Sequence, residues 1–135
     1  MRWAGHAGLF SDVHDLVAYT QAWLAPRAGF LNATTLAAFT AQYDHAQSSR
    51  ALGWNTNADD AEDHGFSYAC GTLSPSTFMH TGYTGPVVCA DPVRKVATVL
   101  LCNRVYPDRN SASKWISTRR AFNTMVQKVW DSQKH

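Results

Sequence analysis

His80-Thr81-Gly82-Tyr83-Thr84-Gly85 is the stretch that decides the fold of this 135-residue chain. Its two glycines lie three residues apart, with hydroxyl-bearing residues beside and between them and apolar segments on either side. A glycine places no side chain between the backbone and an approaching molecule, so the stretch predicts an open strand edge that a ligand can follow. The same spacing also fits a tight bend between two ordinary strands, and both interpretations remain open at this point.

Strand-like segments lie on both sides of this stretch. Residues 86–105 are rich in Val, Leu and Ala and are interrupted at residues 91–95, where Asp-Pro begins typical turn chemistry. They predict a β-hairpin. Residues 51–54 and 66–70 predict two short strands upstream, and residues 76–82 predict the strand that carries the beginning of the stretch.

Two helices are predicted before the sheet. Ser11-Asp12 is a helix cap, and the apolar residues that follow recur at helical spacing, which predicts a helix over residues 12–25. Asn32 precedes a second periodic set and predicts a helix over residues 33–44. Asn32-Ala33-Thr34 also fits the glycosylation acceptor pattern, but the position favours a helix cap.

Ser111 begins a long C-terminal helix, over residues 111–132, whose wide apolar face predicts packing on the sheet. The near-continuous apolar run at residues 96–102 indicates a sheet that is covered on both faces. The chain is therefore predicted to be α+β, with an antiparallel sheet and a long C-terminal helix packed on it. We expect one domain over residues 1–135, with a helical segment up to residue 50 and the sheet in residues 51–105.

The composition indicates a globular chain. Hydrophobic residues make up 45% and charged residues 16%, and the net charge is only +2. A small and scattered charge predicts no nucleic-acid partner, and the basic pair Arg119-Arg120 is predicted to lie on a solvated helix face. No apolar run is long enough to span a membrane. Residues 1–6 show no signal-peptide pattern, which leaves the localisation open.

The cysteines and the acidic loop offer no site. Cys70, Cys89 and Cys102 are odd in number and lie in apolar segments, so we expect buried free thiols. Residues 55–65 form a polar loop with four acids, but they lack the ligand spacing and central glycine of a calcium loop. No metal and no cofactor is predicted.

Four motifs in order resemble the β-lactamase and penicillin-binding-protein family of active-site serine hydrolases, in particular its class C, esterase and D-Ala-D-Ala peptidase-like branch. They are Gly5-His6-Ala7-Gly8-Leu9-Phe10-Ser11, Ala51-Leu52-Gly53-Trp54, the stretch from His80 to Gly85, and Asp91-Pro92 followed by Val99-Leu100-Leu101-Cys102-Asn103-Arg104. The resemblance covers nearly the whole chain and implies the C-terminal part of that fold. The N-terminal helices would then belong to its helical subdomain, and the domain would be incomplete.

The resemblance also implies functional roles for the central stretch. The family's third motif is Lys-Thr-Gly, and this branch can carry His in place of Lys, which matches His80-Thr81-Gly82. These three residues are therefore expected to bind the substrate. The backbone amide of Tyr83 is expected to be one of two oxyanion donors, a role suited to a fixed amide because the charge develops only in the transition state.

The sequence departs from the family at the nucleophile. The family's Ser-x-x-Lys and Tyr-x-Asn or Ser-x-Asn motifs lie upstream of the matching region, and neither is present in position here. Ser111-Ala112-Ser113-Lys114 fits Ser-x-x-Lys literally, but it follows the third motif and opens the terminal helix. Ser111 is therefore interpreted as a helix cap. The nucleophile is absent, and we expect the isolated chain to be inactive.

Two functions remain open. The chain is either the C-terminal part of a serine hydrolase, acting by acyl transfer on a β-lactam, ester or D-amino-acid peptide, or a non-catalytic binding or structural remnant of the same fold. The first predicts a small-molecule or peptide substrate with a carboxylate. An incomplete sheet would also require a complementing N-terminal chain or a homodimer.

Overall fold

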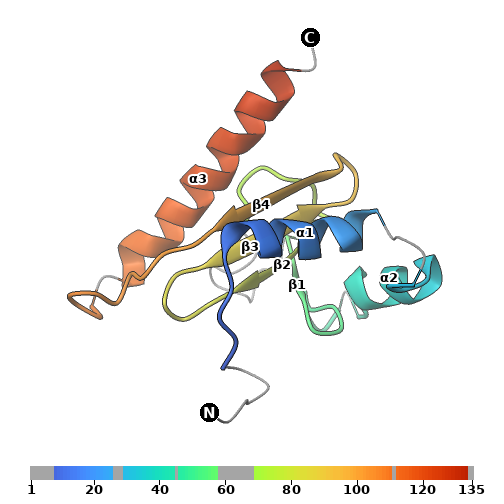
Figure 1. The fold of residues 1–135 in the computed structure, drawn as a ribbon, viewed down its shortest axis with the longest axis horizontal. Helices are drawn as coiled ribbons and strands as arrows, with labels where there is room; N and C mark the ends of the chain where they lie inside the picture. Colours follow the sequence, from blue (N-terminus) through green and yellow to red (C-terminus); the bar gives the residue numbers. More distant parts are fainter. Residues whose placement is uncertain (1–7, 26–28, 45, 58–68, 111, 134–135) are drawn as a thin grey trace.

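The computed structural model describes residues 8–25, 29–44, 46–57, 69–110 and 112–133. Its sheet is antiparallel, with four strands in the order β1-β2-β3-β4 (Figure 1). The strands are β1 (Asn55–Thr56), β2 (Phe78–Thr81), β3 (Val87–Asp91) and β4 (Val96–Leu100). The predicted hairpin is confirmed as β3 and β4, although β4 ends at Leu100 instead of residue 105.

The predicted strand at residues 51–54 is wrong, and the one at residues 66–70 is wrong for its last two residues. Residues 51–54 form a bend, and the strand begins just after them, at Asn55. Ala69 and Cys70 lie in a turn, while residues 66–68 fall outside the described residues. Both predictions relied on short apolar runs, and such runs do not distinguish a strand from a buried turn.

The first helix begins one residue after its predicted start at residue 12, and the second begins at the predicted residue 33. The side chain of Asp12 accepts hydrogen bonds from the amides of His14 and Asp15 at the start of α1 (Val13–Leu24). Asn32 caps α2 (Ala33–Thr40), which ends before the predicted residue 44 because Ala41 has extended backbone angles. The third helix, α3 (Ala112–Ser132), follows the prediction closely. Three helices and an antiparallel sheet in the described residues agree with an α+β class.

Helices cover both faces of the sheet, as the apolar run in β4 predicted. Helix α1 lies across β3 and β4 on one face (Figure 1), and α3 contacts β4 from the other face, where Thr98 donates a hydrogen bond to Asn123. The α1 face carries Phe78, Ala90 and Ala97, whereas Met79 and Cys89 belong to the opposite core cluster. This alternation follows from the two-residue period of a strand.

The prediction of three free thiols is wrong for two of them. Cys70 and Cys89 form a disulfide with a Cα–Cα separation of 5.9 Å, and Cys102 is the free cysteine. The bond joins the turn before β2 to the centre of β3, a proximity that arises from the tertiary fold. Apolar surroundings suit a buried disulfide as well as they suit a free thiol, so local sequence does not separate the two.

Within the described ranges, no helix combines the length and the apolarity that crossing a membrane requires. The longest, α3, has 21 residues, but polar and charged side chains interrupt its apolar positions.

Candidate functional site

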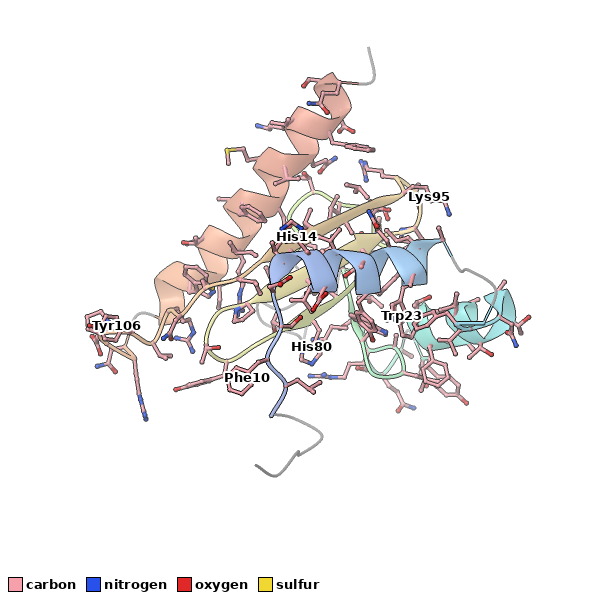
Figure 2. The ribbon with its side chains drawn as sticks, in the orientation of Figure 1. Phe10, His14, Trp23, His80, Lys95 and Tyr106 are labelled. Carbon is pink, nitrogen blue, oxygen red and sulfur yellow. A yellow bond between two sulfur atoms is a disulfide. The ribbon has the colours of Figure 1, made fainter. Side chains whose placement is uncertain are left out.

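The β2 edge is open where the predicted site begins. Strand β1 pairs with Phe78 and Met79, and in the described part of the chain no strand continues this pairing along His80 and Thr81. His80 is exposed, and it shares a sheet face with Phe78, the face on which α1 packs (Figure 2). Thr81 is half-buried.

Backbone direction at this edge follows from one hydrogen bond. The amide of Gly82 donates to Pro86 O at 2.9 Å, and so it points toward β3. Backbone groups of successive residues in extended chain point to opposite edges, so those of Thr81 point toward the open edge. The N–H of Tyr83 points the same way, because it lies opposite the Gly82 carbonyl in one trans peptide and that carbonyl accepts from the amide of Gly85 across the bend. Among the described residues, none accepts a hydrogen bond from the Tyr83 amide.

Residues 82–85 form the tight bend that was one of the two interpretations of the glycine spacing. The amide of Gly85 donates to Gly82 O at 3.0 Å, and Gly85 has a φ of 119°, in the region that favours glycine. A Cβ at Gly85 would lie 2.6 Å from Cys102 Sγ and 3.1 Å from Trp115 Nε1. The bend joins β2 to β3, and the open edge lies beside it on β2.

Helix α3 holds this bend from behind. Arg119 donates from Nη2 to Gly82 O at 2.6 Å and to Pro86 O at 3.2 Å, and from Nε to Gly85 O at 2.9 Å. The indole of Trp115 donates to Gly85 O at 2.8 Å. The predicted solvated pair is therefore wrong for Arg119, which is 6% exposed, while Arg120 is exposed.

Arg104 holds the outer part of the bend. Its Nε donates to Tyr83 O and its amide donates to Thr84 O, both at 2.7 Å. Its guanidinium carbon also lies 5.0 Å from the centre of the Tyr83 ring, a cation–π distance. Tyr83 is nevertheless 69% exposed.

Burial sets the electrostatics behind the bend. Desolvation lowers the pKa of Arg119, but a guanidinium keeps its charge at any physiological pH. Desolvation raises the pKa of Cys102, against the opposing effect of Arg119 and Arg104. This thiol is therefore protonated at neutral pH and is a poor nucleophile.

Several predicted residues cannot be placed. The acids and histidine at residues 59–64 and the proposed cap Ser111 lie outside the described residues. In the part of the chain that the structure describes, no three His, Cys, Asp or Glu side chains gather as metal ligands would.

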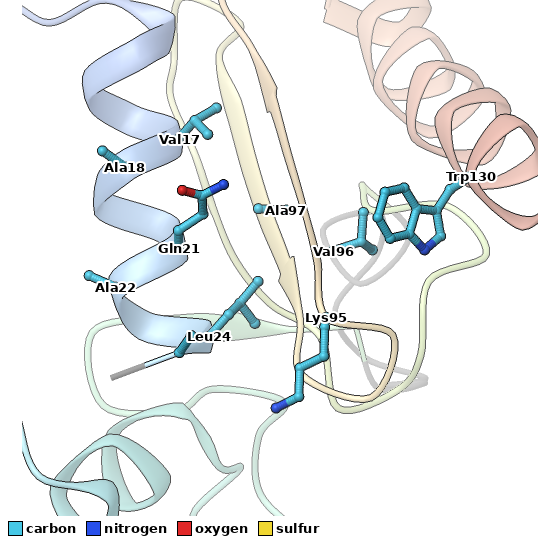
Figure 3. A pocket seen from close by; sticks show the side chains of 10 residues that line it. Val17, Ala18, Gln21, Ala22, Leu24, Lys95, Val96, Ala97 and Trp130 are labelled. Atoms are coloured by element: carbon cyan, nitrogen blue, oxygen red, sulfur yellow. The ribbon is translucent and has the colours of Figure 1, made fainter. Parts of the chain in front are cut away.

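A separate cavity of about 520 Å³ lies away from the bend, between α1, the start of β4 and Trp130 (Figure 3). Its lining is mostly aliphatic, with Val17, Leu24 and Val96 among its residues, and Gln21 and Lys95 provide polar groups. None of the predicted site residues lines it.

The site therefore combines an open strand edge with a rigid bend on an α+β framework. The Beta-lactamase family model matches residues 1–121, and the chain belongs to that family. The match confirms the resemblance that the four sequence motifs indicated.

The relatives are longer proteins. Proteins named "Putative D-alanyl-D-alanine carboxypeptidase" from Salmonella enteritidis, Salmonella gallinarum and Salmonella newport are each 37% identical to the chain over 106 residues. The match covers 75% of this chain but 23% of each relative, so the chain spans less than a quarter of their length. No solved structure matches the chain significantly.

Proposed function

We propose that this chain provides the substrate-binding strand of a serine hydrolase that acts by acyl transfer. In this proposal His80, Thr81 and Gly82 bind the substrate, and the backbone amide of Tyr83 is one oxyanion donor. The observation that carries the proposal is the β2 edge at His80 and Thr81, which no described strand covers. Membership of the Beta-lactamase family supports it.

The substrate class is a peptide that ends in a carboxylate. The relatives' printed name refers to a D-alanyl-D-alanine carboxypeptidase, and an extended peptide fits an open strand edge because it can pair its backbone as an added strand. His80 and Thr81 lie at this edge with side chains that can hydrogen-bond a terminal carboxylate.

The serine nucleophile must then come from chain outside these 135 residues, either in the same polypeptide or in a complementing chain or homodimer. Helix α3 supports the need for such a partner, because Met125 is 61% exposed and Val129 is 54% exposed. Apolar side chains of this size at neighbouring helical positions favour a covering surface. The relatives' greater length is consistent with a further segment that supplies both the cover and the serine.

The chain alone should therefore form no acyl-enzyme. We expect no mass adduct after incubation with a fluorescent penicillin, since the family's Ser-x-x-Lys motif is not present in position. A stoichiometric adduct on Ser111 would contradict this assignment.

His80 gives the test of substrate binding, in the chain fused to or co-expressed with a segment that carries Ser-x-x-Lys. A hydrogen bond to a charged group contributes about 1.5–3 kcal/mol, so His80→Ala should lower kcat/KM for an anionic D-alanyl-D-alanine peptide roughly ten- to a hundred-fold. A neutral ester should respond less, and His80→Lys should retain activity. His14→Ala is the matched control, because His14 is also exposed but lies on α1. Equal losses in the His80→Ala and His14→Ala variants would refute the proposal.

A further inference from the structure

The five carbonyl oxygens of residues 82–86 all accept hydrogen bonds from Arg104, Trp115 or Arg119. These donors come from the segment after β4, far from the bend in sequence. A short hairpin bend needs few of these bonds to form, because the bonds between Gly82 and Gly85 and between Gly82 and Pro86 already close it. The additional donors therefore fix how each peptide group of the bend is oriented.

The bond to Gly82 O acts on a particular peptide group. The carbonyl of Gly82 and the amide of Tyr83 belong to the same peptide unit, which is trans. In a trans peptide the C=O and N–H bonds point in opposite directions. The Gly82 carbonyl accepts from the Gly85 amide across the bend and from Arg119 on α3. Together these two donors direct the Tyr83 N–H to the other side, toward the open edge.

The charge of Arg119 adds to this orientation. Its guanidinium is largely buried, and Nη2 lies 2.6 Å from Gly82 O, a short charge-assisted contact. A cation on the carbonyl oxygen draws electron density from the whole peptide group, so the N–H at the other end becomes a stronger donor. Trp115 donates only to Gly85 O and has no such contact with the Gly82–Tyr83 peptide.

We propose that Arg119 is a positioning residue that orients and polarises the Gly82–Tyr83 peptide, so that the Tyr83 N–H faces the open edge as a strong hydrogen-bond donor. The functional meaning of this device rests on the proposed function, in which that amide binds the oxyanion. Arg119 itself does not touch the substrate.

Amide NMR of the labelled 135-residue chain tests the proposal without a ligand. Arg119→Met keeps the apolar stem and removes the donors, and it should move the Tyr83 amide proton and nitrogen resonances to higher field. Arg119→Lys restores a cation and should give an intermediate shift. Trp115→Phe is the matched control on the same helix, and it should leave the Tyr83 resonances close to their wild-type positions.

Unchanged Tyr83 resonances in folded Arg119→Met, or equal shifts in Trp115→Phe, would overturn the proposal. If Arg119→Met does not fold, the test is made on the wild-type chain. The measurement is then the scalar coupling across the hydrogen bond, between the Arg119 side-chain nitrogens and the Gly82 carbonyl carbon. We expect that coupling to be present, and its absence would overturn the proposal. If the chain binds no peptide, the proposed function is refuted. The NMR results on Arg119 do not depend on peptide binding, so they would still test the positioning role.

Discussion

The two faces of the sheet are held by different chemistry. On the α1 face, aromatic rings pack together, with ring centroids 5.1 Å apart for Trp54 and Phe78 and 5.3 Å apart for Trp23 and Trp54. On the α3 face, the disulfide and the buried polar side chains of Arg119 and Asn123 make directed bonds.

The difference explains how α3 sets the orientation of the backbone in the bend. Burial of aromatic side chains stabilises the fold in proportion to the apolar area removed from water and depends little on direction. A hydrogen bond from α3, in contrast, sets the direction of the backbone oxygen that accepts it. The α1 face is also less completely packed. The cavity beside Val17 and Lys95 lies there (Figure 3). The buried Trp23 Nε1 on this face has no hydrogen-bond partner among the described residues.

Removal of an aromatic ring from the α1 face should have the largest effect on stability. Phe78 is 2% exposed and contacts both Trp23 and Trp54, so Phe78→Ala should lower the free energy of unfolding by about 3–5 kcal/mol. Urea unfolding measures the change. Phe39→Ala is the control, because Phe39 is 43% exposed, and a loss as large at Phe39 would show that burial on this face is not the cause.

Reduction of the Cys70–Cys89 disulfide should have the next largest effect. The bond closes a loop across a sequence separation of 19, which corresponds to about 3 kcal/mol of unfolding free energy in the loop-entropy description. Urea unfolding with and without reductant measures it. In a Cys102→Ser background the free thiol is absent, so reductant acts only on the Cys70–Cys89 disulfide. An unchanged midpoint after reduction would contradict the prediction.

Asn123 tests the directed bonds of the α3 face. Its side chain is fully buried, accepts from Thr98 Oγ1 at 2.5 Å and donates to Ala69 O at 2.8 Å. Asn123→Ala leaves these partners unsatisfied and should lower the unfolding free energy by about 1–3 kcal/mol. Thr98→Val should then have a smaller effect in the Asn123→Ala background than alone. Additive losses in that cycle would show that the bond makes no separate contribution.

Loss of the negative charge of Asp91, at the end of β3, should have the smallest effect on stability. Burial acts to raise the pKa of Asp91, but hydrogen bonds from Ser74 and Arg94 outweigh it and lower the pKa. Its stabilising contribution is therefore present above the ordinary aspartate pKa of about 3.9 and is lost as the pH falls below that value toward the lower, folded-state pKa.

Urea midpoints between pH 6 and pH 3 measure this contribution. Asp91→Asn should be less stable than wild type at pH 6, and the difference should shrink as the pH falls below about 4. A constant difference over the whole range would show that ionisation of Asp91 does not stabilise the fold.

Local signals predicted the elements better than the contacts between them. Ser11-Asp12 and Asn32 were recognised as helix starts because a helix start is determined by a few adjacent residues. The cap of the first helix is Asp12, which was predicted to be its first residue. The turn at residues 91–95 was recognised for the same reason. The disulfide and the role of Arg119 depend on pairs distant in sequence, and neither was predicted.

The sequence of helix α3 contains a pattern that indicates burial of Arg119, but the pattern is made of polar and aromatic residues and not of aliphatic ones. Trp115, Arg119, Asn123 and Gln127 recur every four residues, which places them on one face, and that face is turned toward the sheet and the bend. The apolar residues Met125 and Val129, which were expected to pack on the sheet, are exposed. Polar side chains at a constant helical spacing can therefore mark the buried face of a helix whose neighbour presents backbone carbonyls.

A residue-by-residue amide shift map with N-acetyl-D-alanyl-D-alanine tests most directly whether the β2 edge binds substrate. The peptide is added at millimolar concentration to the labelled chain, and the largest shifts should fall on Thr81 and Tyr83, whose backbone N–H groups face the open edge. Shifts that cluster instead around the cavity lined by Val17 and Lys95, with no change along residues 80–83, would contradict the assignment.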